Sequence, residues 1–157
     1  MTPKISVVMP VYNRGGMVGA ALESLRRQSF DDFEIVAVDD GSTDDTVAAL
    51  EALGEPRLRV VPMGRNTGNP TARNAGLAAA LGAYVAILDS DDAALPERLA
   101  AQAAFLDRHP EVAMVASLSE EMRADGRATG KVKRRPLSAD AMRAHALFRC
   151  PVLQSTV

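Results

Sequence analysis

Short β-rich runs alternate with amphipathic helical patterns over the first 118 residues, and this alternation limits the fold more than any other feature of the chain. Apolar residues at helical spacing separate the β-rich runs. Strands that alternate with helices form βαβ units and a mostly parallel sheet. The sequence therefore predicts an open α/β sheet flanked by helices in three layers, α/β/α. The runs that predict its strands are 5–9, 33–38, 58–61, 84–88 and 112–116.

The last 39 or so residues lose this alternation, so we place a boundary near residue 118. The charged stretch 120–136 predicts a mobile loop, which is either a solvated connection or a basic lid over phosphates; its cations are Lys131, Lys133, Arg134 and Arg135. A short helix is predicted over 138–147 and a strand over 152–157. A chain that stops inside a strand-like run is expected to be truncated.

Composition excludes several classes of protein. A net charge of −2 gives no reason to expect nucleic acid as a partner, and the single Cys150 rules out an internal disulfide. No apolar run approaches the roughly 20 residues that span a bilayer, and the N-terminus lacks a signal-peptide core. We therefore expect a cytoplasmic location, at the cytoplasmic face of a membrane if the complete protein is longer. A monomer and a homodimer both stay open.

Polar clusters follow three of the predicted strands. They are Tyr12-Asn13, Asp39-Asp40 and Asp89 to Asp92. Ligands of such sheets bind beyond the carboxyl ends of the strands, so these clusters should meet at one rim. Asp39-Asp40 alone is equally consistent with a turn and helix cap. Neighbouring side chains on a strand point to opposite faces, so the two aspartates should not share one role.

The cluster Asp89-Ser90-Asp91-Asp92 is the stronger indication of a site. Three carboxylates in four residues repel one another unless a cation lies among them, and oxygen ligands favour Mg²⁺ or Mn²⁺. A solvated acidic turn is the simpler alternative. Nearby, Arg73 offers a phosphate contact and Tyr12 offers a ring on which a base can stack. Either residue is also consistent with an ordinary surface position.

Taken together, these motifs resemble the family 2 glycosyltransferases of GT-A fold. The resemblance covers about residues 4–118, with a weaker match in the last strand-like run. Each motif alone is weak, but their order and strand context are specific. The motifs are Pro10-Val11-Tyr12-Asn13, Val38 to Asp44, the spaced Asn66, Gly68, Ala72-Arg73-Asn74 and Gly76, and Asp89 to Asp92.

The resemblance implies a GT-A-like, Rossmann-like core over 1–118 that binds a nucleoside-diphosphate sugar, with uracil the usual base. Residues 119–157 would then be a loop, a short helix and the start of an incomplete acceptor-side region. Implied donor-binding residues are Pro10, Tyr12, Asn13, Asp39, Asp40, Asn66, Gly68, Arg73, Asp89 and Ser90. Mn²⁺ or Mg²⁺ would bind Asp91 directly, with Asp89 toward the metal, its waters or the ribose.

Individual roles follow by the same resemblance. Tyr12 and Asp40 would contact the base, Asp39 the ribose region, and Arg73 the base or diphosphate. A cation at Asp91 would stabilise the charge that leaves with the diphosphate; two unit charges about 4 Å apart interact by roughly 4 kcal/mol at an effective dielectric near 20. The sugar would pass, with inversion, to an acceptor hydroxyl in polysaccharide, glycolipid or glycoprotein assembly.

Several alternatives stay open beside this interpretation. Inverting members of the family use a later carboxylate as general base, which we expect beyond Val157, because Glu120 and Glu121 fall in a predicted loop. The chain is therefore either the donor half of an enzyme or a truncated nucleotide-sugar-binding module without transfer activity. A phosphorylated signalling receiver and a sugar nucleotidyltransferase fit less well. The former needs acidic residues after the first strand, and the latter needs a Gly-rich basic loop there.

Overall fold

The computed structural model describes residues 2–123, 125–135, 138–147, 150 and 152–157. Its elements are β1 (Ile5–Val11), α1 (Gly15–Arg26), β2 (Phe33–Asp39), α2 (Thr46–Ala52), β3 (Leu58–Pro62), α3 (Asn69–Ala79), β4 (Tyr84–Ile87), α4 (Arg98–Arg108), β5 (Ser119–Met122), β6 (Ala128–Lys133), α5 (Ala139–Ala146) and the 3₁₀ turn η1 (Gln154–Thr156). None of the helices in the described residues is both long and apolar enough to cross a bilayer.

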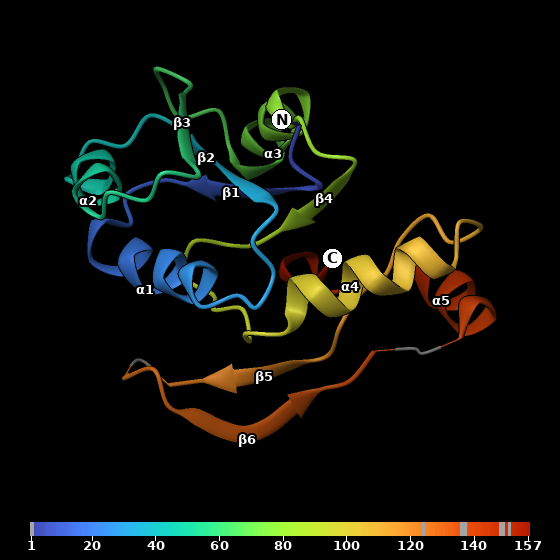
Figure 1. Ribbon diagram of the computed structural model, residues 1–157. Helices are drawn as coiled ribbons and strands as arrows, with labels where there is room; N and C mark the ends of the chain where they lie inside the picture. Colours follow the sequence, from blue (N-terminus) through green and yellow to red (C-terminus); the bar gives the residue numbers. More distant parts are fainter. Residues whose placement is uncertain (1, 124, 136–137, 148–149, 151) are drawn as a thin grey trace.

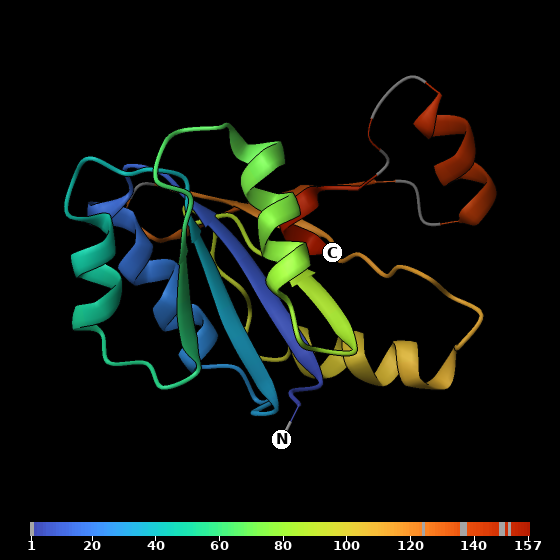
Figure 2. The ribbon, with the colours of Figure 1, turned by 90° about the horizontal axis from the view of Figure 1, so that it is seen from above.

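The core is a four-stranded sheet with the spatial order β3-β2-β1-β4 (Figures 1 and 2). All its pairings are parallel, and β1 pairs with β2 on one side and β4 on the other. From β1 the chain adds strands outward through β2 and β3, and then returns to the opposite side with β4. The strand order therefore reverses between β1 and β4, which confirms the open parallel sheet and marks where its ligands should bind.

Helices cover both faces of this sheet, as the three-layer prediction requires (Figure 1). Val7 and Met9 of β1 belong to the larger apolar cluster, which also contains buried residues of α1, α2 and α4. Val8 points the other way, into a smaller cluster with Ala72 of α3. β1 is buried along its whole length because it lies between these two layers.

Helix α3 packs unusually close to the sheet at Gly76. A Cβ on this residue would lie 2.3 Å from Val8 Cγ1 and 3.0 Å from Val38 Cγ2. Both valines are fully buried, so neither can move aside without disturbing the core. The missing side chain thus sets how closely α3 approaches β1 and β2.

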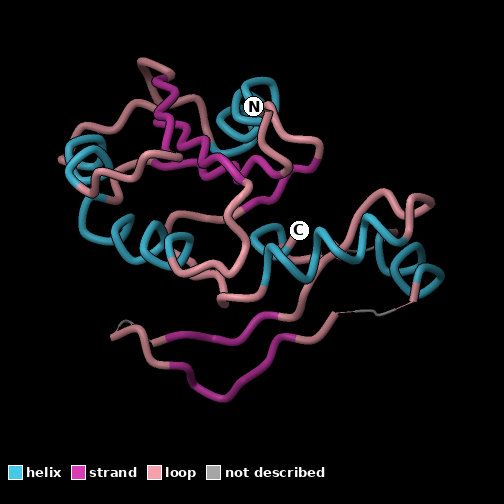
Figure 3. The backbone as a smooth tube through the Cα atoms, in the orientation of Figure 1, coloured by secondary structure: helices cyan, strands magenta, loops and turns pink. Residues whose placement is uncertain are grey.

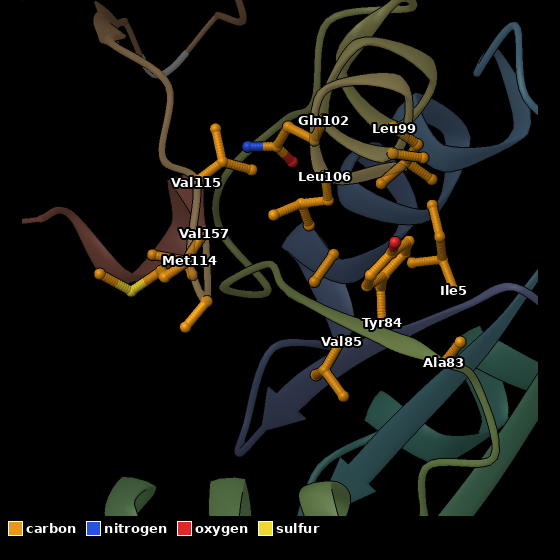
Figure 4. A pocket seen from close by; sticks show the side chains of 13 residues that line it. Ile5, Ala83, Tyr84, Val85, Leu99, Gln102, Leu106, Met114, Val115 and Val157 are labelled. Atoms are coloured by element: carbon orange, nitrogen blue, oxygen red, sulfur yellow. The ribbon is translucent and has the colours of Figure 1, made fainter. Parts of the chain in front are cut away.

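The predicted strand over 112–116 is wrong, because this segment pairs with no strand. It passes instead beside β4 and α4, where Met114 and Val115 wall an apolar pocket of about 240 Å³ together with Leu106 and Val157 (Figure 4). The apolar run 84–88 predicts a strand that is buried on both faces, and this is also wrong. β4 lies at the edge of the sheet, and Val85 is 36% exposed.

Two predictions for the last part of the chain also need correction. The stretch 120–136 is not a loop but contains the antiparallel hairpin β5-β6, set apart from the main sheet (Figure 3). Its cross-strand ion pairs join Glu121 to Lys131 and Lys133. The run 152–157 is not a strand, because Thr156 bonds back to the Leu153 carbonyl and closes η1. The predicted helix over 138–147 is confirmed as α5.

Candidate functional site

A cleft of about 360 Å³ opens at the carboxyl ends of β1 and β4, where the strand order reverses. It collects the three polar clusters that the sequence placed at strand ends. The loops after β1, β2 and β4 and the start of α3 form its walls. Its lining residues are Pro10, Val11, Tyr12, Arg14, Asp40, Asn66, Gly68, Asn69, Ala72, Asp89, Ser90 and Asp91. The expected common rim therefore exists.

Tyr12 and Asp40 approach the cleft in different ways. Tyr12 follows β1 and is 40% exposed, so its ring is open to a planar ligand. Asp40 is only 3% exposed, and its carboxylate binds the start of the α3 region. Oδ1 accepts hydrogen bonds from the Thr67 amide and hydroxyl at 2.8 and 2.7 Å, and Oδ2 accepts one from the Gly68 amide at 2.8 Å.

These bonds also determine the charge of Asp40. Burial acts to raise the pKa of this carboxyl, but the hydrogen bonds from Thr67 and Gly68 outweigh burial and hold the pKa below its usual value. Asp40 is therefore ionised at neutral pH. Each carboxylate oxygen can accept about two hydrogen bonds, so Oδ2 keeps one acceptor position beyond its bond to Gly68.

Asn13 and Asp39, both predicted to bind the ligand, do not line the cleft in the described structure. Asn13 has a positive φ of 51°, and its Oδ1 accepts the Thr43 amide hydrogen at 2.9 Å. Asp39 Oδ1 accepts the Ser42 amide hydrogen at 3.0 Å, and the Ser42 hydroxyl accepts from the Asn13 amide. These bonds join the loops after β1 and β2, and Asp39 and Asp40 have different partners, as the pleat predicted.

Asp89 is held from two sides. Its Oδ1 forms an ion pair with Arg73 Nη2, and its Oδ2 accepts the Ser155 hydroxyl hydrogen at 2.7 Å. Arg73 itself does not line the cleft within the described residues. Its Nε is buried and has no hydrogen-bond partner there. Arg73 is therefore placed to set the position of Asp89 and, through it, the acidic wall of the cleft.

Asp91 is an exposed carboxylate at the wall of the cleft. Its side chain is 52% exposed, and the cation paired with it is Arg14, whose Nη2 lies 3.9 Å from Oδ2. The described residues contain no ready-made group of three or more His, Cys, Asp or Glu side chains around one point. A cation at Asp91 would therefore take further oxygens from ligand phosphates and water, which is the usual coordination of Mg²⁺. The donor set fits such an ion.

The sequence interpretation missed three residues of this region. Arg14 and Asn69 line the cleft, and Ser155 contacts Asp89 from 66 positions away. Arg14 directly follows Tyr12-Asn13 at the end of β1, so its position at a strand end was a usable signal. Ser155 had no such signal, because only the fold brings η1 beside β4.

Comparison with known proteins identifies the family. The family model for glycosyl transferase family 2 matches residues 6–153, nearly the whole chain and every motif of the cleft. The chain belongs to glycosyl transferase family 2. The resemblance seen in its sequence is thereby confirmed.

Curated relatives of this family 2 chain include glycosyltransferases of longer sequence. The succinoglycan biosynthesis protein ExoO of Rhizobium meliloti is 42% identical over 97 residues, which are 62% of this chain and 28% of ExoO. The glycosyltransferase GlyG of Streptococcus pneumoniae is 38% identical over 59% of this chain and 31% of its own length. The chain thus spans less than a third of these relatives.

Solved structures give the same fold for this family 2 chain. Residues 1–349 of Staphylococcus aureus TarS, in complex with UDP-GlcNAc, match with a TM-score of 0.65 and 35% identity over 82% of this chain and 37% of that one. The mannosyltransferase PcManGT of Pyrobaculum calidifontis, in complex with GDP-Man and Mn²⁺, matches with a TM-score of 0.64 and 28% identity over 78% and 36%. These neighbours are GT-A enzymes, which confirms the predicted fold class.

Proposed function

We propose that this chain binds the nucleoside diphosphate of a sugar donor, a UDP-sugar, in the cleft between β1 and β4, together with Mn²⁺ or Mg²⁺. The observation that carries the proposal is the convergence of Tyr12, Asp40 and the Asp89–Asp91 loop on one cleft at the reversal of strand order. The complexes of TarS with UDP-GlcNAc and of PcManGT with GDP-Man and Mn²⁺ support it.

The base and ribose occupy the side of the cleft formed by β1 and β2. Tyr12 stacks against the base, and the remaining acceptor position on Asp40 Oδ2 receives one base N–H. One acceptor suits the single N–H of a uracil ring. Asn66 and Gly68 also line the cleft, and by resemblance Asp39 acts on the ribose region.

The diphosphate and metal occupy the opposite side, along the loop after β4. Asp91 contributes a carboxylate oxygen to the metal, and Asp89 acts on its waters or on the ribose. A metal ion held there would supply positive charge that offsets the negative charge of the departing diphosphate. Arg14 pairs with Asp91 in the free chain, so its guanidinium is close enough to this wall to contact phosphate oxygens once the metal takes its place.

Transfer itself requires an acceptor hydroxyl and a base that removes its proton, and by resemblance it proceeds with inversion. We assign no residue of the cleft to that base. Glu120 and Glu121 lie on the hairpin, where Glu121 pairs with lysines and Glu120 accepts the Gly130 amide hydrogen. The name of ExoO supports a place in polysaccharide biosynthesis, and the acceptor is a glycan, lipid or protein.

Calorimetric titration of UDP with and without Mn²⁺ tests donor binding. Loss of a residue that hydrogen-bonds to a metal ligand weakens metal binding by about 10- to 100-fold. Asp91 is the proposed ligand itself, so Asp91→Asn should weaken Mn²⁺-dependent UDP binding at least about tenfold. Asp92→Asn is the matched control, because Asp92 is exposed and does not line the cleft. Its affinity should stay near that of the wild type. Equal wild-type affinity with and without Mn²⁺ would contradict the metal assignment.

A donor-hydrolysis assay separates the two alternatives for this chain. Release of UDP from UDP-GlcNAc that depends on Mn²⁺ and is lost in Asp91→Asn would show that the cleft activates the bond between the sugar and the diphosphate. Tight UDP binding without hydrolysis would instead favour a nucleotide-sugar-binding module that has no transfer activity by itself.

A further inference from the structure

Ser155 reaches the acidic loop from a distant part of the chain. Its hydroxyl donates to Asp89 Oδ2 at 2.7 Å and accepts the Asp89 amide hydrogen at 3.2 Å. Arg73 binds the other oxygen of the same carboxylate. Two side chains from different elements thus hold Asp89, the first carboxylate after β4, at the edge of the cleft.

The turn that carries Ser155 is firmly attached to the rest of the fold. Gln102 Nε2 of α4 donates to the Thr156 carbonyl at 2.7 Å, and the Ser117 amide donates to the same oxygen at 3.1 Å. Arg98 Nη2 donates at 2.9 Å to the carbonyls of both Val157 and Ile87. Its guanidinium thereby connects η1 with the end of β4.

These contacts leave little freedom for the Ser155 hydroxyl. Arg98 is partly buried, and burial lowers its pKa to about 10, so it remains charged at neutral pH and keeps its donors. Charge-assisted hydrogen bonds are stronger than neutral ones. The turn therefore presents Ser155 to Asp89 as a fixed partner.

We propose that Ser155 is a positioning residue for Asp89, fixing the rotamer in which one carboxylate oxygen meets Arg73 and the carboxylate stays at the cleft wall. The proposal rests on the proposed function, since it gives Ser155 a role in donor binding through Asp89. Outer partners of this kind orient the groups that touch a metal or ligand, and losing them costs affinity without removing a ligand contact.

A first experiment needs no ligand. The Asp89 amide donates to the Ser155 hydroxyl, so Ser155→Ala should speed hydrogen exchange at Asp89, followed by NMR on the full 157-residue chain. Thr156→Val is the matched control: it removes a hydrogen bond inside the same turn, to the Leu153 carbonyl, without touching Asp89. Its Asp89 exchange should equal that of the wild type. Unchanged exchange in Ser155→Ala would overturn the proposal.

A second experiment measures UDP affinity with Mn²⁺ by calorimetry. By analogy with other outer partners, Ser155→Ala should weaken binding by about tenfold, and Ser155→Thr, which keeps the hydroxyl, should restore it to within about twofold. Thr156→Val should bind like the wild type. A loss of equal size in Thr156→Val would show that the turn has only a structural role, and this would overturn the proposal.

The decisive comparison is a double-mutant cycle with Asp89→Ala. If Ser155 acts through Asp89, Ser155→Ala should cause no further loss of UDP affinity in the Asp89→Ala background. Additive losses would contradict the positioning role while leaving the proposed function intact. If the wild type fails to bind UDP both with and without metal, the proposed function fails. The positioning role then fails with it, even where the exchange experiment succeeds.

Discussion

Asn13 illustrates how a single backbone conformation can organise the site. Among the described residues it is the one non-glycine residue with a positive φ, which is 51°. Asparagine and aspartate tolerate this backbone conformation better than most residues do. Its Oδ1 accepts hydrogen bonds from both the amide and the hydroxyl of Thr43. The side chain thus joins the β1 loop, which carries Tyr12, to the β2 loop.

This geometry predicts a graded response to substitution at position 13. Asn13→Ala loses the hydrogen bonds and the tolerance of positive φ, so it should lower the free energy of unfolding by about 1–3 kcal/mol. Asn13→Gly should cost less, because glycine adopts this φ freely. Asn13→Asp keeps the acceptor oxygen and should remain near the wild type. Urea denaturation measures all three, and an Asn13→Ala chain as stable as the aspartate variant would contradict the argument.

The same residue shows what sequence reasoning could and could not establish about the site. The position of Asn13, Asp39 and Arg73 near a ligand rim followed from strand ends and motifs. The partners of Asn13 and Arg73 did not, because Thr43 and Asp89 approach them only in the folded chain. Whether these three side chains contact the nucleotide stays a prediction.

Among the secondary-structure elements, α3 depends most on close approach to the sheet. Gly76→Ala would place a Cβ 2.3 Å from Val8 Cγ1. Overpacking of a filled core typically costs about 1–3 kcal/mol, which exceeds the gain of up to about 1 kcal/mol from alanine's helix propensity. We expect a net loss of stability and, because α3 borders the cleft, weaker UDP binding.

Gly19 in α1 supplies the control for Gly76. A Cβ at Gly19 meets nothing within 4 Å, so Gly19→Ala should gain about 0.5–1 kcal/mol from helix propensity alone. Thermal denaturation of the two variants beside the wild type gives the comparison. Shifts of the same sign would contradict the packing explanation.

Strand prediction succeeded for the four strands of the parallel sheet, and failed for two runs that have no ladder partner and for the charged hairpin. The runs around Val7, Ile35, Val60 and Ala86 became β1 to β4, because each has a neighbour in the sheet. The run 112–116 has the same β-rich composition but no ladder partner, and 152–157 closes into η1. Hairpin β5-β6 was missed because charged residues weaken the apolar alternation on which strand prediction relies.

For the molecule as a whole, the strand order determines where function can arise. Parallel strands bring the ends of β1, β2 and β4 to one rim, and the reversal between β1 and β4 opens the cleft there. The common rim was predictable from alternation and motif positions, whereas the strand order was not. The contacts that complete the rim, from Arg98 to Val157 and from Ser155 to Asp89, join residues dozens of positions apart and required the structure.

Carboxylates that accept hydrogen bonds make the stability of the whole fold depend on pH. Glu55, whose side chain is 3% exposed, accepts from Arg57 Nε at 2.7 Å and from the Arg57 amide at 3.1 Å. The side-chain bond from Arg57 is the main cause that lowers the pKa of Glu55, although burial opposes it. Asp40 likewise has a lowered pKa. The ionised forms of both carboxyls are thus favoured by folding.

The sign of the pH effect follows from linkage. A carboxyl whose folded pKa lies below its unfolded value of about 4 binds more protons in the unfolded chain, so its stabilisation is present above about pH 4 and is lost as the pH falls through the folded pKa. Glu55→Gln should therefore destabilise the chain by about 1–3 kcal/mol at pH 7, and the difference from the wild type should shrink at pH 3. Glu51→Gln, at an exposed position on α2, should change little at either pH. Urea titrations at both pH values measure this, and a Glu55→Gln deficit that stays constant from pH 7 to pH 3 would show that the ionised Glu55–Arg57 pair is not its source.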